Sequence, residues 1–329
     1  MAAALRILLT QRWPEAAEAA LAERYQVEFV QGPLADVAQW REALAGFDAI
    51  CPCVSDRFGP ELGDLKGGEL KNIRTRLIAN YGVGYNHIDL DAARRLGLAV
   101  SNTPGVLTDA TADLAMTLML MVARRTGEGE RQLRAGGWHG WYPTHLMGAS
   151  VTGATLGIVG MGRIGQAMAR KAHYGFDMPI LYHSRSEAKD PEVARMGARF
   201  FADMDDMLAQ ADFVALHCPG GAQTRHLFNA GRFAAMQPHA FLINTSRGDV
   251  VDEAALIQSL DAGHLAGAAL DVYEREPQVS PGLLGRENVV LLPHLGSATL
   301  TARTAMGMKA KANLDAFFAG QPLPDCVQA

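Results

Sequence analysis

Cysteine is scarce in this sequence, and the few cysteines present do not form a recognisable metal or redox motif. The 329 residues include Cys51, Cys53, Cys218 and Cys326. The segment CPC places one residue between Cys51 and Cys53, whereas zinc and redox motifs usually have two. The ten histidines include no pair at metal-ligand spacing on a helix. We therefore expect ordinary reduced thiols and no metal site.

Long apolar runs and a strong net charge are also missing. The apolar run from Leu114 to Ala123 is far shorter than the roughly 20 residues that span a bilayer. The first residues, MAAALRILLTQRW, lack the layout of a signal peptide. The net charge of -5 gives no reason to expect a surface that binds polyanions. We expect a cytoplasmic protein that binds neither nucleic acid nor a membrane.

The chain length suits two domains that share a cleft. The first hundred residues alternate short apolar runs with helical patterns, in the order ALRILLT, PEAAEAALAERY, QVEFV, FDAICPCV, RLIANYG, DLDAARRLG and LAVSN. This alternation predicts a doubly wound α/β unit. The segment NTPG then interrupts it. A long helical stretch is predicted from Thr108 to about Arg134, followed by an irregular segment that contains glycine and tryptophan.

A second and more apolar alternation begins at Thr155. Its predicted strands are TLGIVG, PILYHS, ADFVALHCP, AFLINTS, LAGAALDV and NVVLLPHLG. Such apolar strands between helices are typical of a parallel sheet buried on both faces. The sequence therefore predicts an α/β fold with two doubly wound parallel-sheet domains, of which the second is a Rossmann domain. The last thirty or so residues have a helical pattern that could return to the first domain.

A glycine-rich turn joins the first strand of this second alternation to its helix. Gly160, Gly162 and Gly165 form the pattern G-x-G-x-x-G. The first glycine permits a tight turn, the second lets the backbone approach a pyrophosphate, and the third lets the helix pack closely on the strand. The start of the helix then offers free N–H groups to the phosphates. Together with its position between a strand and a helix, this pattern predicts a dinucleotide site.

The next strand, ILYHSRSE, lacks the acidic residue that usually ends it. Asp or Glu is expected about 20 residues after the glycines, where it binds the ribose hydroxyls of NAD. Ser184 stands there instead. A small hydroxyl leaves room for the 2′-phosphate of NADP, and Arg185 can supply the countercharge, although Arg185 and Lys189 also suit an ordinary surface. The sequence predicts NADP(H) as the preferred cofactor, with NAD(H) possible.

Three polar residues follow later strands, in NTSRGDVVDE, DVYEREP and LLPHLGSAT. Ligands of such sheets bind outside the carboxyl ends of the strands, so Arg247, Glu276 and His294 are expected in one crevice. Arg247 can grip a carboxylate and a keto oxygen, His294 can deliver a proton, and Glu276 can hold the imidazole. Taken singly, Arg247 could be a surface charge, Glu276 a turn residue and His294 a strand-end histidine. Jointly they predict reduction of a 2-keto acid.

The segments GMGRIG, INTSRGDVVDE, ALDVYEREP and PHLGSAT resemble those of the D-isomer-specific 2-hydroxyacid dehydrogenases, in the usual order and over nearly the whole chain. The resemblance implies that Arg247, Glu276 and His294 are the catalytic residues, with His294 as the proton donor when the keto acid is reduced. The segment NYGVGYNHID resembles the family's substrate loop. It implies that backbone N–H groups near Val83 and Gly84 receive the substrate carboxylate, together with Arg247 and His294.

The glycine pattern and the resemblance together give a set of expected cofactor-binding residues. Asp271 would suit the nicotinamide carboxamide, whereas His87 is expected to be a loop histidine and not a second acid. The expected set is Thr111, Gly160, Gly162, Arg163, Ile164, Gly165, Ser184, Arg185, Ser186, Cys218, Pro219, Thr245, Ser246, Asp271 and Gly296.

The resemblance also implies a discontinuous domain layout. A flavodoxin-like substrate domain is expected from residues 1–101 and 299–329, with a Rossmann NAD(P)-binding domain, 102–298, inserted into it and hinges near 101 and 298. An arm at about 127–153 resembles the segment through which these enzymes form homodimers. Trp138 or Trp141 is a candidate to reach the neighbour's active site. The alternative is that both tryptophans fill the dimer interface.

Within the family the sequence looks most like the glyoxylate/hydroxypyruvate reductases, which form glycolate and D-glycerate. Formate dehydrogenases have glutamine in place of Glu276, and phosphoglycerate dehydrogenases often add a regulatory domain, whereas this chain ends about thirty residues after His294. A broad or aromatic D-2-hydroxyacid dehydrogenase is the runner-up. A dinucleotide-sensing binding protein like the transcriptional co-repressors of this fold is the alternative from another class, but the chain shows no disordered extension for recruiting partners.

Overall fold

The computed structural model describes residues 4–30, 32–67 and 73–327 and divides into two compact units. Unit 1 is Met1–Leu107 with Ser297–Ala329, and unit 2 is Thr108–Gly296. These limits differ by a few residues from the expected ones at 101 and 298. The backbone N–H of Asn102 donates to Asp325 O and that of Thr103 donates to Gly82 O, so both residues stay with unit 1.

Unit 1 contains a five-stranded parallel sheet. The strand order is β2 (Gln26–Phe29), β1 (Arg6–Leu9), β3 (Ala49–Cys51), β4 (Leu77–Ala79) and β5 (Ala99–Ser101), which is the flavodoxin-like order. Alternate strand residues are buried against opposite helix layers. Leu8, Ile50 and Ile78 face one layer, and Ile7, Ala49 and Leu77 face the other. The fold class predicted for this part of the chain is confirmed.

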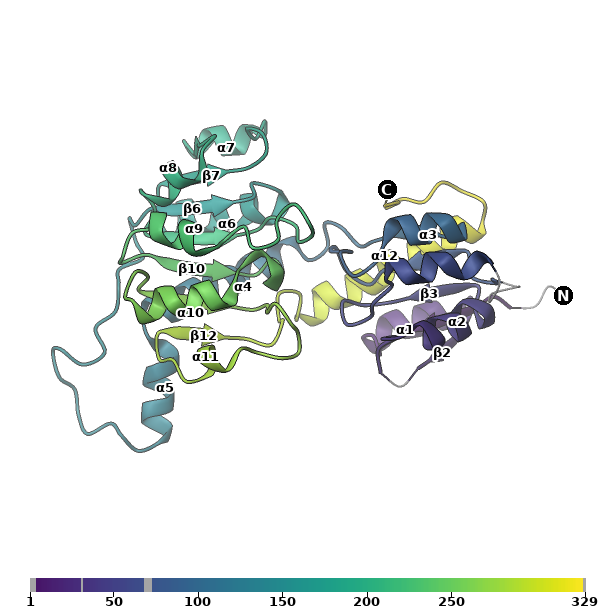
Figure 1. Ribbon diagram of the computed structural model, residues 1–329, viewed down its shortest axis with the longest axis horizontal. Coiled ribbons are helices and arrows are strands. Elements are labelled where there is room, and N and C mark those ends of the chain that lie inside the picture. The colour runs from purple at the N-terminus through teal and green to yellow at the C-terminus, as the bar shows by residue number, and fades with distance from the viewer. Residues whose placement is uncertain (1–3, 31, 68–72, 328–329) are drawn as a thin grey trace. The chain divides into compact units, whose positions relative to one another are not determined.

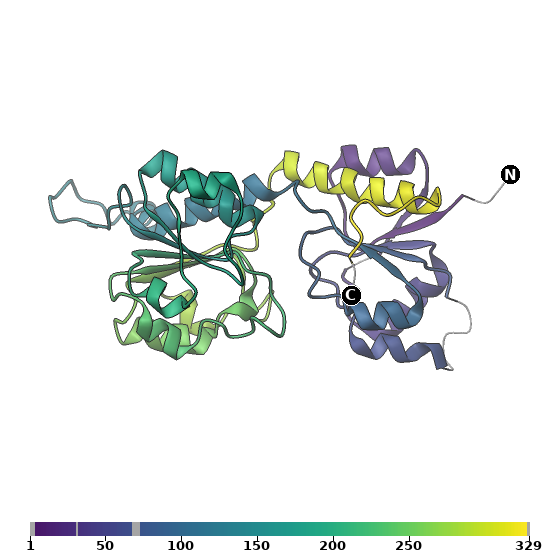
Figure 2. The ribbon, with the colours of Figure 1, turned by 90° about the horizontal axis from the view of Figure 1, so that it is seen from above.

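Two helices cover each face of this sheet. Helices α1 (Glu15–Ala22) and α12 (Leu300–Phe318) lie on one face, and α2 (Val37–Gly46) and α3 (Leu90–Leu96) lie on the other, beside the 3-10 helix η1 (Pro60–Gly67) (Figure 2). The C-terminal helix α12 packs tightly on α1, because a Cβ at Gly307 would lie 2.5 Å from the Cβ of Ala17. The last helix of the chain therefore completes the unit that the first strand begins.

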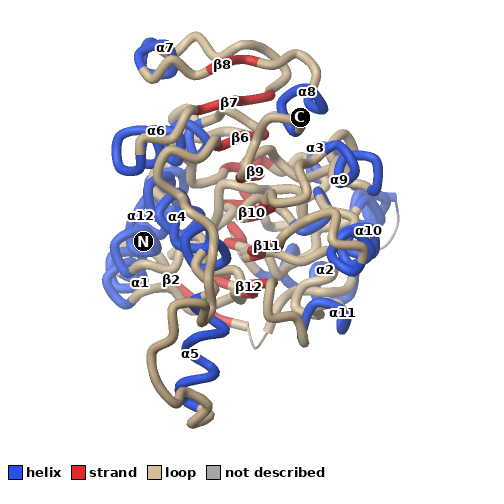
Figure 3. The backbone as a smooth tube through the Cα atoms, turned by 90° about the vertical axis from the view of Figure 1, so that its left-hand side faces the viewer, coloured by secondary structure: helices blue, strands red, loops and turns tan. Residues whose placement is uncertain are grey.

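Unit 2 contains a seven-stranded parallel sheet of Rossmann type (Figures 1 and 3). Its order is β12 (Val289–Leu291), β11 (Gly267–Leu270), β10 (Phe241–Asn244), β9 (Phe213–Leu216), β6 (Leu156–Val159), β7 (Ile180–His183) and β8 (Arg199–Phe200). All residues of β6, β9 and β11 are buried, as the apolar runs predict for central strands covered on both faces. The two-residue edge strand β8 was not predicted, since a run of that length has no periodicity to detect.

The helices of unit 2 form a layer on each side of its sheet. One apolar core lies beneath α4 (Thr108–Ala123) and α6 (Arg163–Phe176), with α7 (Pro191–Arg195) at its edge. The opposite core lies beneath α8 (Met204–Leu208), α9 (Ala230–Ala235), α10 (Glu253–Asp261) and α11 (Pro281–Leu284). Figure 3 shows the two layers on either side of the strands. Among the described residues, no helix has both the length and the apolar character needed to cross a bilayer.

The helical stretch predicted from Thr108 to about Arg134 is present but consists of two helices. Helix α4 ends at Ala123, Arg125 adopts a left-handed backbone with φ 52°, and α5 (Thr126–Arg134) begins a separate helix. No residue of α5 is buried, so no packed face holds it in line with α4. Helix α5 and the loop after it extend away from the sheet of unit 2, as Figure 1 shows.

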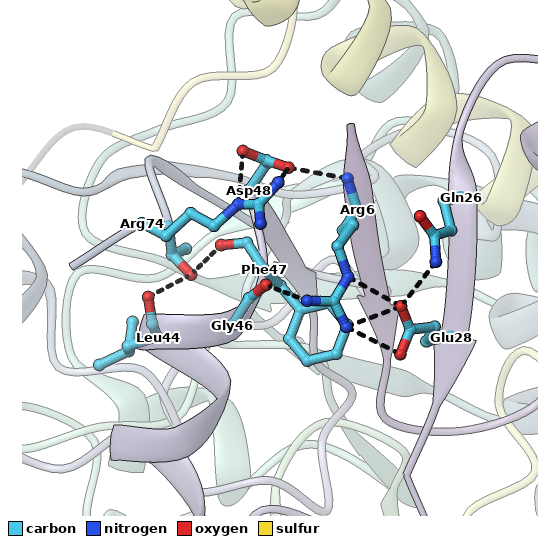
Figure 4. Close-up of polar contacts among 9 residues, drawn as sticks. Arg6, Gln26, Glu28, Leu44, Gly46, Phe47, Asp48 and Arg74 are labelled. Atoms are coloured by element: carbon cyan, nitrogen blue, oxygen red, sulfur yellow. Dashed lines mark hydrogen bonds and ion pairs between the residues drawn. The ribbon is translucent and has the colours of Figure 1, made fainter. Parts of the chain in front are cut away.

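A group of charged side chains ties together the amino ends of the strands in unit 1 (Figure 4). Arg6, at the start of β1, donates two hydrogen bonds to Glu28 at 2.9 and 3.0 Å. Asp48, directly before β3, accepts from Arg6 N at 2.7 Å and from Arg74 Nε and Nη2 at 3.0 and 2.7 Å. Partial burial works to raise the pKa of Asp48, but Arg74 and the Arg6 N–H outweigh it and lower this pKa.

We expect Asp48→Ala to lower the free energy of unfolding by about 1–2 kcal/mol, because the substitution leaves the Arg6 N–H without its acceptor. The lowered pKa means that the contribution of Asp48 is present above its ordinary pKa of about 4 and is lost as the pH falls further. Urea unfolding near pH 7 and near pH 3 measures both effects. The exposed Glu42→Ala is the matched control, and an equal loss at both pH values would contradict the proposed ionisation.

Candidate active site

The glycine-rich turn between β6 and α6 has the shape of a phosphate cradle. Gly160 has φ +97°, and a Cβ there would lie 2.7 Å from Cys218 N. A Cβ at Gly165 would collide with Gly160 O, whereas nothing lies within 4 Å of the corresponding position at Gly162. Gly162 also precedes α6 without a side-chain cap. The first N–H groups of α6, at Arg163, Ile164 and Gly165, donate to no acceptor among the described residues, and an uncapped helix start of this kind suits the diphosphate of a dinucleotide.

The loop after β7 carries Ser184, Arg185 and Ser186. The Ser184 hydroxyl donates to Ser186 O at 2.6 Å, so it is engaged inside its own loop and is not simply free to donate outwards. Arg185 is exposed and forms no ion pair with any described residue. The backbone joins this loop to the phosphate turn, since Gly160 N donates to His183 O at 2.8 Å. The loop after β7 is thus fixed beside the glycine-rich turn.

Most of the other expected cofactor residues lie at the carboxyl ends of the strands of unit 2. Cys218 and Pro219 follow β9, and Thr245 and Ser246 follow β10. Burial raises the pKa of the Cys218 thiol to about 11, which keeps it neutral at ordinary pH. Their common edge of the sheet is where ligands bind in open parallel sheets.

Asp271 has a structural task that the sequence did not reveal. Its buried carboxylate accepts from the N–H groups of Leu295 and Gly296 at 2.6 and 2.8 Å, and Thr111 donates to Gly296 O at 3.1 Å. Burial raises the pKa of Asp271 despite these bonds. Asp271 therefore holds the turn after β12 in place. If Asp271 also binds the nicotinamide carboxamide, the same carboxylate oxygens must serve both the turn and the cofactor.

Arg247 is held by the loop after β10, and the buried Asn244 organises this loop. Asn244 Oδ1 accepts from the N–H and the hydroxyl of Ser246 at 3.0 and 2.8 Å, and its Nδ2 donates to Arg247 O at 2.9 Å. The Arg247 guanidinium donates to Ser246 O at 2.7 Å. Gly220 lies against the side chain, since a Cβ there would be 2.7 Å from Arg247 Cγ. The Arg247 side chain is thus held by its hydrogen bond to Ser246 O and by its close contact with Gly220.

The environment of Arg247 suits an anionic ligand. Burial lowers the pKa of Arg247, while the carboxylates of Glu276 and Asp249 act in the opposite direction. Arginine remains protonated in proteins, so this residue contributes a positive charge that bulk water screens poorly. A substrate carboxylate or a polarised keto oxygen at this position would be strongly stabilised.

The loops after β10 and β11 are in direct backbone contact. A Cβ at Gly248 would collide with the carbonyl group of Tyr273, so only glycine allows the two loops to approach this closely. The second of these loops carries Glu276. Close packing of the two loops therefore places Arg247 and Glu276 near enough for their charges to influence each other.

Glu276 and His294 form a hydrogen-bonded pair. His294 Nδ1 lies 2.8 Å from Glu276 Oε2, and Glu276 Oε1 accepts from Tyr273 N at 3.1 Å. Burial works to raise the pKa of Glu276, but the bonds from His294 and Tyr273 and the charge of Arg247 lower it below its usual value. Glu276 is therefore an anion at neutral pH. Its bond to Nδ1 leaves His294 Nε2 as the nitrogen available to a substrate, since Nε2 bonds to no described residue.

His294 has an unusual backbone conformation that sets the direction of its side chain. Its φ is +56°, in the left-handed region that non-glycine residues rarely occupy. The N–H of His294 donates to Asp271 O at 2.9 Å, and the Asp271 side chain holds the next two residues. These bonds stabilise a conformation that is strained for a histidine.

The expected substrate loop belongs to unit 1 and follows β4. The carbonyls of Gly82, Val83 and Gly84 all accept hydrogen bonds from within the unit. The N–H groups of Val83 and Gly84 donate to no acceptor among the described residues. They are therefore available to an anion, and the role toward a substrate carboxylate that the family resemblance implies stays a prediction.

Three asparagines with positioning roles were missed from the sequence. Asn80, Asn102 and Asn244 each end or follow a strand. The side chains of Asn80 and Asn244 donate to the loop that comes next in the chain, whereas Asn102 donates to Val83 O in the loop after the neighbouring strand β4. The available signal was the repeated placement of asparagine at a strand end, in ANYGVG, SNTPG and INTSRG. Short amides are well suited to such local bonds. Within the described residues, no three His, Cys, Asp or Glu side chains are grouped so that they could hold a metal ion.

A phosphate cradle, a partly buried arginine and an imidazole–carboxylate pair along one edge of a Rossmann sheet define a nicotinamide-dinucleotide-dependent oxidoreductase. The family model described as D-isomer specific 2-hydroxyacid dehydrogenase, NAD binding domain, matches residues 116–296. The chain belongs to this family. It is accordingly an NAD(P)-dependent D-2-hydroxyacid dehydrogenase, and it acts as a 2-keto acid reductase.

The relatives are similar over almost their full length. A glyoxylate reductase from Thermococcus litoralis is 42% identical over 328 residues, which cover 98% of this chain and 96% of that protein. A glycerate dehydrogenase from Hyphomicrobium methylovorum is 38% identical and covers 96% of both chains. The crystal structure of an NADPH-dependent glyoxylate/hydroxypyruvate reductase from Sinorhizobium meliloti with NADP and malonate has a TM-score of 0.85 at 33% identity, covering 99% of this chain and 97% of that one. The predicted family and enzyme class are confirmed.

Proposed function

We propose that this enzyme is an NADPH-preferring glyoxylate/hydroxypyruvate reductase. The observation that carries the proposal is the pairing of His294 with Glu276 at 2.8 Å, close to the partly buried Arg247 and on the same sheet edge as the phosphate cradle. This combination supplies a proton donor and a cation for a keto acid. The names of the relatives from Thermococcus litoralis and Sinorhizobium meliloti support the choice of substrate.

Each residue has a separate task in the proposed reaction. The N–H groups of Val83 and Gly84 bind the substrate carboxylate, and Arg247 polarises the keto oxygen. The glycine-rich turn from Gly160 to Gly165 would hold NADPH, which would supply the hydride for the keto carbon. His294 Nε2 gives its proton to the keto oxygen, so that the carbonyl becomes a hydroxyl and the product is glycolate or D-glycerate. Glu276 keeps the ring oriented with Nε2 toward the substrate and stabilises the charged imidazole.

Steady-state kinetics with a small panel of keto acids tests this proposal. The panel is glyoxylate, hydroxypyruvate and phenylpyruvate, each with NADPH and with NADH. We expect the highest kcat/KM for glyoxylate or hydroxypyruvate with NADPH. A clear preference for phenylpyruvate would favour a broad or aromatic dehydrogenase, such as the D-mandelate dehydrogenase of Rhodotorula graminis that is 29% identical. No turnover with any pair would favour a dinucleotide-sensing binding protein.

The proposed NADPH preference depends on the loop after β7. We expect Ser184→Asp to shift the ratio of kcat/KM for NADPH over NADH at least about tenfold toward NADH, because the new carboxylate repels the 2′-phosphate and accepts the ribose hydroxyls. Ser184→Ala is the matched control: it removes the hydroxyl without adding charge and should change the ratio only a few-fold. If Ser184→Asp leaves the ratio unchanged, Ser184 does not set the cofactor preference.

We also propose that the enzyme is a homodimer through the arm at about 127–153. Support comes from the large apolar side chains that this segment exposes. Trp141 is 79% exposed and Trp138 53%, and Leu133, Tyr142 and Met147 are exposed as well. Exposed apolar patches of this kind are typical of protein interfaces. Either tryptophan is a candidate to contribute to the partner's active site.

A further inference from the structure

The loop after β4 has three consecutive carbonyl groups that are all held in place. Asn80 Nδ2 donates to Gly82 O and to Gly84 O, each at 3.0 Å. Asn102 Nδ2 donates to the intervening Val83 O at 2.8 Å. Asn80 comes directly after β4 and Asn102 directly after β5, and these two strands are neighbours in the sheet. The three carbonyls therefore all point back toward the strand ends.

Peptide planarity turns this arrangement into an anion site. In a trans peptide the C=O of one residue and the N–H of the next point in opposite directions. Fixing the carbonyls of residues 82, 83 and 84 toward the strand ends therefore turns the N–H groups of Val83, Gly84 and Tyr85 away from them. None of these three N–H groups donates to an acceptor among the described residues. Such a run of free N–H groups is suited to a carboxylate.

The orientation of the Asn80 amide follows from its partners. Its nitrogen must face the two carbonyls, since only the NH₂ group can donate to Gly82 O and Gly84 O. Its oxygen then faces His87 Nε2, at 3.0 Å. His87 must therefore carry a proton on Nε2 and donate it to Asn80 Oδ1. The side chain of Asn80 is buried, with the residue only 1% exposed, so water cannot replace these partners easily.

We propose that Asn80, oriented by His87, is the positioning residue that sets the affinity of this loop for the carboxylate of the substrate. The inference rests on the proposed function. Neither Asn80 nor His87 is assigned a contact with the reacting carbon or oxygen. Asn80 acts by holding the carbonyls of Gly82 and Gly84 toward the strand ends. His87 acts by donating to Asn80 Oδ1, which keeps the Asn80 amide from flipping. Together they allow the loop to bind a carboxylate without a lysine or arginine of its own.

The test for Asn80 is the nearly isosteric Asn80→Asp. The carboxylate cannot donate to Gly82 O and Gly84 O, so the loop loses two of its restraints. We expect the KM for glyoxylate to rise about 10- to 100-fold, while kcat changes less than about threefold and the KM for NADPH stays the same. The exposed Asn288→Asp, which makes the same chemical change in unit 2, is the control and should behave like the parent enzyme.

A second readout does not depend on turnover. Oxalate added to ¹⁵N-labelled enzyme should shift the backbone amide signals of Val83, Gly84 and Tyr85 in the parent protein, and Asn80→Asp should weaken this response about tenfold or more. Asn102→Asp removes one restraint instead of two and should weaken it less. This variant also keeps the inference testable if Asn80→Asp does not fold. An unchanged oxalate affinity in both folded variants would overturn the inference.

The role of His87 is tested by a pair of variants. His87→Leu removes the donor to Asn80 Oδ1 and should raise the KM for glyoxylate about three- to tenfold, with kcat and its pH profile unchanged. His87→Gln can donate from nearly the same position and should restore the KM to within about twofold. If both variants lose kcat and alter the pH profile, His87 is an acid in the reaction and the inference is wrong.

The proposed function and the role of Asn80 can fail separately. If the parent enzyme reduces none of the keto acids but oxalate still shifts the three amide signals in an Asn80-dependent way, the proposed function fails and the loop assignment survives. If the parent enzyme reduces glyoxylate and Asn80→Asp has unchanged KM and oxalate affinity, the proposed function stands and the role of Asn80 is refuted.

Discussion

Replacing His294 by asparagine is expected to lower kcat for glyoxylate reduction by about 10²- to 10⁴-fold, the usual contribution of a positioned general acid. Asparagine is preferable to alanine here because it tolerates the left-handed backbone of residue 294, where φ is +56°. Its amide can still bond to Glu276, but it cannot release a proton at neutral pH. The binding of NADPH should be unchanged, since the phosphate cradle around Gly162 is untouched.

The exposed His264→Asn serves as the control for this substitution and should leave kcat unchanged. Measuring kcat and the dissociation constant of NADPH for both variants separates chemistry from binding. If His294→Asn retains more than about a tenth of the parent kcat, another group supplies the proton, and the pairing with Glu276 has a structural purpose only.

Replacing Arg247 by glutamine is expected to lower kcat/KM for glyoxylate by about 10²- to 10⁴-fold, through a lower kcat and a higher KM together. The Arg247 side chain is partly buried, so the substitution removes a positive charge that bulk water replaces poorly. Loss of substrate binding alone would raise KM, and loss of carbonyl polarisation alone would lower kcat. A change in both parameters is expected because one residue performs both tasks.

Arg247→Lys refines this prediction. Lysine keeps the charge but not the planar fork, so we expect activity between that of the parent enzyme and that of Arg247→Gln. The exposed Arg275→Gln is the control, and circular dichroism with urea unfolding confirms that the variants are folded. A rise in KM with kcat unchanged would reduce Arg247 to a binding residue.

The sequence alone predicted the parts of this protein that depend on local patterns. Apolar runs of strand length, helical periodicity and the glycine spacing from Gly160 to Gly165 are all readable over short distances, and the two parallel sheets follow from them. Arg247, Glu276 and His294 were accessible for a related reason. Parallel strands place their carboxyl ends at one edge, so polar residues just after several strands are expected to gather there.

Features that depend on how each segment packs and bonds in the folded chain were beyond reach of these patterns. The chain between Thr108 and Arg134 has helical character throughout, yet the helix breaks at Arg125 because α5 has no face to bury. The Ser184 hydroxyl has the chemistry to meet a phosphate, but in the structure it bonds to Ser186 O. Propensity describes what a segment can form, whereas packing decides what it forms.

Composition and order along the chain determined the α/β fold, the dinucleotide turn and the identity of the three catalytic candidates. Only the tertiary structure decided how these groups are held: Asp271 fixing the turn of His294, Gly248 allowing two loops to touch, and Asn80 holding the carbonyls of the loop after β4. The physical reason is that a hydrogen bond depends on direction and on distances of about 3 Å. Such geometry is set by the folded backbone and leaves little trace in the spacing of residue types.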